Sequence, residues 1–252
     1  SRQEARELAK KEYWGIYGSD IYYYEDTFKG VLDGSTFADI IRARQEQHLP
    51  VNVLELMGNG QALTDLDVDN ALAVTLSDLR GSRRKRKDRK SSIHLLPGDI
   101  LSKKTWQNIE KWLDNNTANS NFDLILMRPV AGWSMIPADP RLHYYLMNRL
   151  YKMLSVNQGS MYIEFNSVPF DYSRIYDLWL AELGKTSGIE LKSSPEQYVF
   201  RLTRNPEAPE DPGGKAQTTH FVLPETAGRG AGFSRQRESG CWARAGRRWG
   251  QA

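Results

Sequence analysis

Seven short apolar runs occur between residues 51 and 203, and most are separated by longer stretches with helical periodicity. The runs are VNVLEL (51–56), LAVTLS (72–77), SIHLLPG (92–98), DLILMRP (123–129), SMYIEF (160–165), IELKSS (189–194) and YVFRLT (198–203). Strands that alternate with helices favour a mostly parallel sheet covered on both faces. Only residues 195–197 separate the last two runs, so that pair is expected to be antiparallel. The pattern predicts an α/β fold with a seven-stranded, mostly parallel sheet, an antiparallel last strand and helices on both faces.

Three of the intervening stretches place apolar residues at helical spacing. They are KKTWQNIEKWLDNN (103–116), DPRLHYYLMNRLYKML (139–154) and DYSRIYDLWLAEL (171–183). The second begins with Pro140, a residue that suits the first turn of a helix. Between the second and third runs the chain instead has RGSRRKRKDRKSS (80–92). This segment is too short and too uniformly charged to lay an apolar face on a sheet, so we expect a solvated loop there.

Composition divides the chain into three parts. Residues 1–49 indicate helix and turn, and their aromatic segment from Tyr13 to Tyr24 is expected to pack on the sheet, with one or two residues acting as a lid. Residues 50–204 contain the predicted strands and form the ligand-binding domain. Residues 205–252 are rich in Gly, Pro, Ala and Arg and show no sustained period, which predicts a disordered tail. The 252 residues suffice for one substantial core.

Several classes of protein are disfavoured by composition. The single cysteine, Cys241, excludes an intramolecular disulfide and argues against a Cys-based metal site, so no metal is expected. No apolar run approaches the roughly 18 residues of a transmembrane helix, and the N-terminus is too polar for a signal peptide. We therefore expect a cytoplasmic protein with no membrane partner. The net charge of +3 does not demand a nucleic-acid partner, and only the basic run from Arg83 to Lys90 offers a local site for one.

The first run ends in a lone carboxylate, Glu55, followed by Gly58 and Gly60. In an open α/β sheet, ligands bind beyond the carboxyl ends of the strands, where the strand order reverses. A phosphate-binding loop needs a Lys and a Ser or Thr after its second glycine, and GNGQAL contains neither. A dinucleotide-binding loop needs a third glycine where Leu63 stands. The loop is expected to lead into a helix and to bind a ligand without phosphates.

Carboxylates accompany three successive runs, at Glu55, Asp78 and Asp99. A carboxylate accepts hydrogen bonds from two hydroxyl groups and has nothing to donate. Such a set suits a ligand with ribose hydroxyls and an amino group but no phosphate, as in the nucleoside of S-adenosylmethionine.

On these residues, the chain from Val51 to Thr203 resembles the class I (Rossmann-like) S-adenosylmethionine-dependent methyltransferases. VLELMGNG matches the first motif, LSD the second, GDIL the third and FDLILMRP the fourth, while the terminal hairpin matches the reversed final strand of that fold. The resemblance implies S-adenosylmethionine as cofactor and methyl transfer as activity. By this resemblance the methionine portion of the cofactor is bound by Glu55, Met57, Gly58, Asn59 and Gly60. Asp78 binds the ribose hydroxyls, and Asp99 and Ile100 flank the adenine. Arg128 lies where the fourth strand opens onto the transferring methyl group.

One departure from the family concerns the glycine loop. The family pattern is E/D-x-G-x-G-x-G, whereas Gly58 and Gly60 are out of step with it by one residue. Asn59 would occupy the central glycine position, and asparagine tolerates left-handed backbone dihedrals better than other non-glycine residues. The shift favours an alternative, a non-catalytic methyltransferase-like module that binds a partner through residues 83–90. NAD-dependent oxidoreduction would leave the terminal hairpin and Asp99 without a role.

The acceptor is the least constrained part of the prediction. MRPVAGW stands where enzymes that methylate the amino groups of bases carry Asn/Asp-Pro-Pro-aromatic, which argues against base N-methylation. Positioning supplies most of the rate of such a reaction, so no catalytic residue is assigned. The sequence favours a small-molecule acceptor over RNA or protein.

Overall fold

The computed structural model describes residues 20–76, 93–128, 136, 139–165, 179–194 and 198–212. Its strands are β1 (Asn52–Leu56), β2 (Asn70–Thr75), β3 (Ile93–Pro97), β4 (Leu124–Met127), β5 (Gly159–Glu164), β6 (Ile189–Ser194) and β7 (Val199–Arg204). Its helices are α3 (Ile21–Phe28), α4 (Phe37–Glu46), α5 (Lys103–Asn116) and α6 (Pro140–Lys152), with a short 3₁₀ helix η1 (Ala62–Asp65). Each predicted strand is present and its ends lie within two residues of the expected ones.

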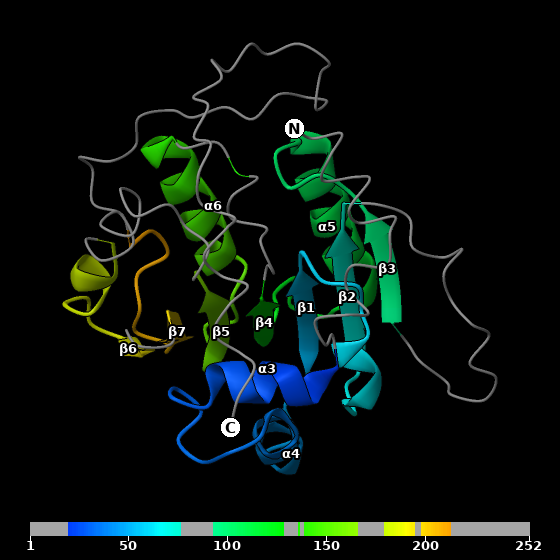
Figure 1. Cartoon of the computed structure of the whole chain (residues 1–252), viewed down its shortest axis with the longest axis horizontal. Helices are drawn as coiled ribbons and strands as arrows, with labels where there is room; N and C mark the ends of the chain where they lie inside the picture. Colours follow the sequence, from blue (N-terminus) through cyan, green and yellow to red (C-terminus); the bar gives the residue numbers. More distant parts are fainter. Residues whose placement is uncertain are drawn as a thin grey trace, which may run out of the picture.

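The strands form one sheet in the order β3-β2-β1-β4-β5-β7-β6. The pairs β1–β2, β1–β4, β2–β3 and β4–β5 are parallel. Strand β7 lies between β5 and β6 and is antiparallel to both. The prediction of a mostly parallel sheet closed by a reversed last strand is confirmed, and Figure 1 shows β1, β2, β4 and β5 side by side with their carboxyl ends at one edge.

Side chains of alternate strand residues enter two separate hydrophobic clusters, one on each face of the sheet. Leu54 and Leu56 of β1 belong to the cluster that includes Trp106 and Leu150 from α5 and α6. Val53 belongs to the other cluster, together with residues of α3 and α4. Helices therefore cover both faces, as the sequence predicts, because successive strand residues point to opposite sides.

The face covered by α5 and α6 follows the predicted amphipathic patterns. Trp106, Ile109 and Leu113 of α5 are all buried, as their helical spacing predicts. Helix α6 begins at Pro140, and the side chain of Asp139 accepts a hydrogen bond from the Arg141 N–H in the first turn. Of the third predicted helix, residues 179–183 are described and form helix, and the rest lies outside the described residues.

The opposite face is covered by the N-terminal helices. The helical segment expected after the glycine loop is short, because residues 57–69 contain the 3₁₀ helix η1 and no α-helix. The link is too short to run back along the sheet as a full helix. Helices α3 and α4 take its place, with Phe28, Phe37 and Ile41 buried against β5 and β1 residues. Figure 1 shows α3 running across the strands, whereas α6 runs alongside them.

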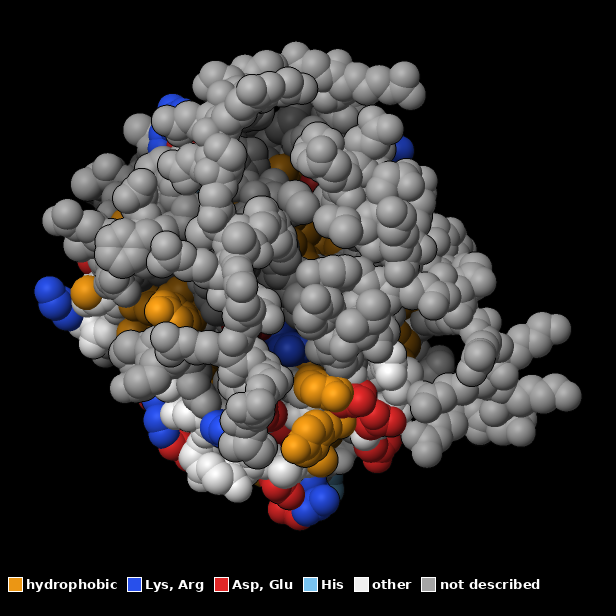
Figure 2. Space-filling view, viewed as in Figure 1, with side chains coloured by type: hydrophobic (Ala, Val, Ile, Leu, Met, Phe, Trp, Pro, Cys, Tyr) orange, Lys and Arg blue, Asp and Glu red, His pale blue; other side chains and the backbone are white. Residues whose placement is uncertain are grey.

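Helix α3 has one buried and one exposed aromatic face. Tyr24 and Phe28 are buried, whereas the exposed fractions of Tyr22 and Tyr23 are 69% and 43%. Figure 2 shows hydrophobic side chains next to acidic ones on this part of the surface. The face of α3 that carries Tyr24 and Phe28 is therefore packed into the core, and the face that carries Tyr22 and Tyr23 is exposed. The remainder of the aromatic segment, from Tyr13 to residue 19, and the basic run 80–92 lie outside the described residues.

A buried ion pair attaches α4 to the amino edge of the sheet. Arg44 Nη2 lies 2.5 Å from Asp123 Oδ1, and Arg44 Nη1 also donates to the carbonyl of Asn157. The other oxygen of Asp123 accepts from the Asn52 N–H at the start of β1. Burial raises the pKa of the Asp123 carboxyl, while Asn52 and Arg44 lower it. One carboxylate thus joins α4, β1 and the segment before β5.

The described fold continues beyond Asn205, where the sequence predicted the tail to begin. Ala208 is buried, its backbone lies against Gly188, and the Tyr151 hydroxyl donates to the Pro209 carbonyl at 2.6 Å. Asn205 itself donates its N–H to the Gly188 carbonyl. The boundary at 205 is therefore too early, because residues 205–212 pack against the β6 end and α6. Residues 213–252 lie outside the described residues.

These contacts predict different effects for two truncations. A chain that ends at Pro212 should keep the melting temperature of the full chain. A chain that ends at Asn205 leaves the Tyr151 hydroxyl without its acceptor and should melt lower by about 3–8 °C. Thermal unfolding followed by circular dichroism measures both. Equal melting temperatures for the two truncated chains would contradict a structural role for residues 206–212.

Candidate functional site at the carboxyl edge of the sheet

The strand order reverses at β1, which lies between β2 and β4. A crevice beyond the carboxyl ends of the strands at such a point is where open α/β sheets bind ligands. The glycine loop, residues 57–60, follows β1 directly at this position. The Met57 N–H donates to the Val74 carbonyl of β2, and the Gly98 N–H after β3 donates to the Thr75 carbonyl. These bonds join the ends of β1, β2 and β3.

The left-handed positions of the loop differ from those expected. Met57 has a φ of 66° and Gly60 a φ of 79°, whereas Asn59 is not among the residues with positive φ. The expectation that Asn59 adopts the left-handed conformation is wrong. Its side chain instead accepts a hydrogen bond from the Gln61 N–H at 2.9 Å. Met57 stands at the first glycine position of the family pattern and takes the glycine-like dihedral, so the loop keeps that bend without that glycine.

A side chain at either glycine would come too close to its present neighbours. A Cβ on Gly58 would lie 2.1 Å from the Glu55 carboxyl carbon. A Cβ on Gly60 would lie 2.8 Å from a methyl carbon of Leu95 and 3.2 Å from the Ala73 Cβ. The loop therefore folds over the Glu55 carboxylate and packs on β2 and β3, and no other residue fits at these two positions without a shift.

Glu55 is completely buried, with an exposed fraction of 0%. One carboxylate oxygen accepts from the Tyr24 hydroxyl at 2.6 Å, and the other accepts from the Gly60 N–H. Burial raises the pKa of the Glu55 carboxyl to about 7, although both donors act to lower it. Burial and the adjacent Glu55 carboxylate also raise the pKa of the Tyr24 phenol. Glu55 thus points at the loop and α3, and both of its oxygens are engaged.

Three charged residues at the ends of neighbouring strands lie on the same face of the sheet. Val53 and Glu55 alternate along β1 with the residues that face α5. Leu126 and Tyr162 belong to the hydrophobic cluster that faces α3. Arg128 lies two positions after Leu126 and Glu164 two positions after Tyr162, so both face the same side. This period places all three charges toward α3 at the carboxyl edge. We call Tyr24, Thr27, Glu55, Arg128 and Glu164 the carboxyl-edge cluster.

Arg128 connects β4 to α3 and β5. Its Nε donates to the Thr27 hydroxyl at 2.8 Å and lies 3.7 Å from a Glu164 carboxylate oxygen. Its guanidinium carbon lies 5.7 Å from the centre of the Tyr24 ring, within range of a cation–π contact. Arg128 is predicted from the sequence, whereas Tyr24, Thr27 and Glu164 are not. A lone carboxylate near the end of an apolar strand was the available signal for Glu164, just as it was for Glu55.

The remaining predicted ligand residues follow β2 and β3. Asp99 is partly exposed, and one of its oxygens accepts from the Leu101 N–H two residues later. It does not cap α5, because the N-cap residue of that helix is Ser102. Ile100 is buried, and its carbonyl accepts from the Trp106 indole N–H at 2.8 Å. Asp78 lies outside the described residues. Of the other predicted residues, the structure places the loop, Asp99, Ile100 and Arg128 at the carboxyl edge of the sheet.

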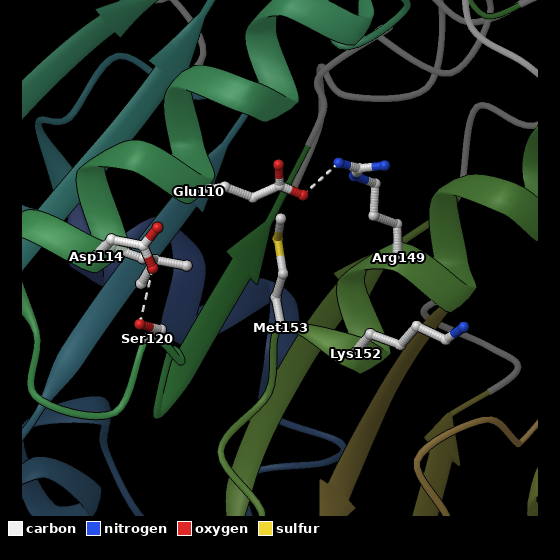
Figure 3. A pocket seen from close by; sticks show the side chains of 7 residues that line it. Glu110, Asp114, Ser120, Arg149, Lys152 and Met153 are labelled. Carbon is white, nitrogen blue, oxygen red and sulfur yellow. Dashed lines mark hydrogen bonds and ion pairs between the residues drawn. The ribbon is translucent and has the colours of Figure 1, made fainter.

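A separate cavity of about 280 Å³ lies between α5 and α6, near the opposite edge of the sheet. It is lined by Glu110, Leu113, Asp114, Ser120, Arg149, Lys152 and Met153. Figure 3 shows Glu110 and Arg149 pointing toward one another from the two helices, where they form an ion pair. Asp114 accepts from the Ser120 hydroxyl, and Lys152 pairs with Asp211. Its charged groups thus pair with partners in the chain itself, and the cavity lies away from the glycine loop.

Neither a metal site nor a membrane-spanning helix is found among the described residues. No group of three or more His, Cys, Asp or Glu side chains there is arranged to hold a metal ion. None of the helices in the described ranges has both the length and the apolar character needed to cross a membrane.

Comparison with known proteins gives structural likenesses only. No family model matches the sequence, and no curated protein matches it. Among solved structures, human Methyltransferase-like protein 13 in complex with SAH is 13% identical, with 67% of this chain and 78% of that chain covered at a TM-score of 0.42. A protein described as a ribosomal RNA methyltransferase from Plasmodium falciparum is 9% identical, with 66% and 93% covered at a TM-score of 0.38. A SAM-dependent methyltransferase from Anabaena variabilis is 14% identical, with 72% and 93% covered at a TM-score of 0.37.

The fold is assigned from the order and direction of the strands. The order β3-β2-β1-β4-β5-β7-β6 with an antiparallel β7 is the Rossmann-like arrangement of class I methyltransferases. The fold predicted from the resemblance is confirmed.

The raised pKa of Glu55 predicts a specific pH dependence of stability. Below its ordinary pKa of 4.5 the carboxyl is protonated in both folded and unfolded chains. Between 4.5 and about 7 the folded chain retains a proton that the unfolded chain releases, so stability falls as the pH rises through this window. From pH 4.5 to 7.5 the free energy of unfolding should fall by on the order of 3 kcal/mol more in the parent than in Glu55→Gln.

Denaturant unfolding of both proteins at several pH values measures this difference. Glu110→Gln, which removes a carboxylate that is half exposed on α5, is the matched control and should follow the parent profile. Parallel profiles for the parent and Glu55→Gln would show that Glu55 titrates alike in the folded and unfolded chains.

Proposed function

We propose that the protein is an S-adenosylmethionine-dependent methyltransferase that acts on a small-molecule acceptor. The observation that carries the proposal is the loop of residues 57–60, which is folded over a buried carboxylate at the reversal point of a methyltransferase-type sheet. A loop whose two glycines are both required by close approaches is typical of a backbone shaped for ligand contact.

The residues at the carboxyl edge fit such a cofactor. Met57, Asn59, Asp99 and Arg128 are partly exposed there, whereas Gly58, Gly60 and Ile100 form buried walls. We assign the loop to the methionine portion, Asp99 and Ile100 to the adenine, and Asp78 to the ribose hydroxyls. We place Arg128 at the end of β4, next to the transferring methyl group. Glu55 contributes by shaping the loop, because both of its oxygens are already engaged.

The chemistry follows from this placement. When bound, S-adenosylmethionine supplies a methyl group already activated by its sulfonium. The chain then has to orient the acceptor in line with that group and exclude water, and such positioning accounts for much of the rate. No catalytic acid or base is assigned. The cytoplasmic location remains a prediction.

A small-molecule acceptor is favoured on charge. The net charge of +3 is spread over 34 basic and 31 acidic residues, so the chain as a whole does not resemble a polyanion-binding protein. The shifted glycine loop supports the second candidate function, a non-catalytic binding module. The glycines are out of step with the family loop, and a non-glycine residue, Met57, adopts one of its left-handed positions.

Cofactor binding tests the proposal directly. We expect S-adenosylhomocysteine to bind the parent in calorimetric titration and NAD not to bind. Replacing Asp78 with Ala removes a charged acceptor for two ribose hydroxyls, which should cost about 2–3 kcal/mol, or roughly thirty- to a hundredfold in Kd. Asp114→Ala, a carboxylate on α5 far from the loop, is the control and should bind as the parent does.

The outcomes separate the two candidates. An unchanged Kd in Asp78→Ala would remove Asp78 from the site. No detectable binding by the parent would favour the non-catalytic module.

The acceptor class is tested through the basic run from Arg83 to Lys90. If this run binds the phosphates of a nucleic acid, affinity should fall as salt rises. The slope of log affinity against log salt concentration is then about −0.7 per phosphate contact for single strands. We expect weak RNA binding that changes little when Arg83, Arg84 and Arg86 are replaced with Ser. The measurement is RNA affinity at two salt concentrations for both proteins. Submicromolar binding that is steep in salt and lost in the triple variant would make RNA the leading acceptor.

A further inference from the structure

A chain of two hydrogen bonds connects the N-terminal helix to the glycine loop. The Tyr24 hydroxyl of α3 donates to one oxygen of Glu55, and the other oxygen of the same carboxylate accepts from the Gly60 N–H. All three groups are buried, so water does not compete for these bonds. The loop is therefore positioned through a residue that lies about 30 positions away in sequence, in a segment before the sheet begins.

Helix α3 also supports the segment that follows the loop. The helix that would follow it is replaced by η1, and α3 contacts η1 directly. Helix α3 is in turn fixed to the sheet by Phe28, which packs edge to face on Tyr162, and by Thr27, which accepts from Arg128. Tyr24 is thus presented to Glu55 from a helix that is itself anchored to β4 and β5.

The carboxylate can satisfy both donors only while it is ionised. A protonated carboxyl group uses one oxygen to donate, so it no longer accepts from both Tyr24 and Gly60 in the same geometry. Burial opposes ionisation, and the Tyr24 hydroxyl favours it by donating to the charged form. Among the described residues, the other charged groups that act on this pair are Arg128 and Glu164. Loss of the Tyr24 hydroxyl would therefore weaken the bond from Gly60 as well as its own.

We propose that Tyr24 is a positioning residue for cofactor binding, which acts through Glu55 to hold the glycine loop in its ligand-binding shape. It acts on the loop through the carboxylate and is not a catalytic residue. The proposal rests on the proposed function for the identity of the cofactor, but not for the geometry of the loop. It makes α3 part of the binding site, so an intact N-terminal segment is required for tight cofactor binding.

Tyr24→Phe removes only the hydroxyl and keeps the buried ring. The matched control is Tyr162→Phe, which removes a hydroxyl from an equally buried tyrosine in the same hydrophobic cluster. That hydroxyl interacts with Arg201, and burial raises the Tyr162 pKa to about 12. The pair therefore separates a general loss of a buried hydroxyl from the specific loss at Glu55.

The first measurement needs no cofactor. Hydrogen exchange of the Gly60 amide should be about tenfold faster in Tyr24→Phe than in the parent, and unchanged in Tyr162→Phe, because only the former weakens the Gly60 acceptor. Glu55→Gln provides a second variant with the same expected result. Should Tyr24→Phe fail to fold by circular dichroism, Glu55→Gln decides this arm.

The second measurement is the Kd for S-adenosylhomocysteine. It should rise about five- to twentyfold in Tyr24→Phe and stay unchanged in Tyr162→Phe. Adding Tyr24→Phe to Glu55→Gln should cause little further loss, since both variants break one chain of bonds.

Each outcome decides a separate point. Unchanged Gly60 exchange in a folded Tyr24→Phe variant would overturn the proposal, whatever Glu55→Gln shows. Faster exchange with an unchanged Kd would overturn the link to the cofactor. If the parent fails to bind S-adenosylhomocysteine, the proposed function falls, and the exchange measurement still decides whether Tyr24 positions the loop.

Discussion

The burial of the Glu55 carboxylate is the constraint on which the carboxyl edge of the sheet depends. A buried charge must be matched by donors, because desolvation otherwise costs several kcal/mol. Here the donors come from the loop after β1 and from α3, so satisfying one carboxylate fixes the positions of both. Gly58 follows from the same constraint, since any side chain there would overlap the carboxylate. The loop shape, the packing of α3 and the choice of glycine are thus consequences of one buried carboxyl group.

The N-terminal helices have a structural role that a typical lid would not have. The connection after β1 contains no α-helix, so the sheet face above β1, β4 and β5 would be exposed without α3 and α4. Polar contacts attach these helices to opposite edges of that face: Tyr24–Glu55 and Thr27–Arg128 at the carboxyl edge, and Arg44–Asp123 at the amino edge. Apolar packing between the edges supplies the area that removes water, and the polar contacts fix the orientation. The segment that looks like an extension in sequence completes the core.

The glycine loop shows how a family pattern can be displaced without loss of its bend. The left-handed turn falls on Met57, where the pattern has a glycine, and again on Gly60. Positive φ costs a non-glycine residue on the order of 1 kcal/mol, and such strain persists where surrounding contacts enforce it. The bond from the Met57 N–H to β2 and the buried carboxylate beneath Gly58 provide that enforcement. This arrangement keeps the loop compatible with ligand binding despite the shift.

The sequence alone determined the sheet and its reversed last strand, because periodicity and the short 195–197 link are local properties of the chain. It also selected Glu55, Asp99 and Arg128, since a polar residue at the end of an apolar strand stands out without any structure. It could not identify Tyr24 as the partner of Glu55 or Thr27 as the partner of Arg128. It also placed the end of the folded domain before residues 205–212, which the structure shows to be packed. Those features depend on which helix covers which face and on contacts between residues far apart in the chain. Tertiary packing decides them, because period-2 alternation fixes the face of a side chain but not what is packed against it.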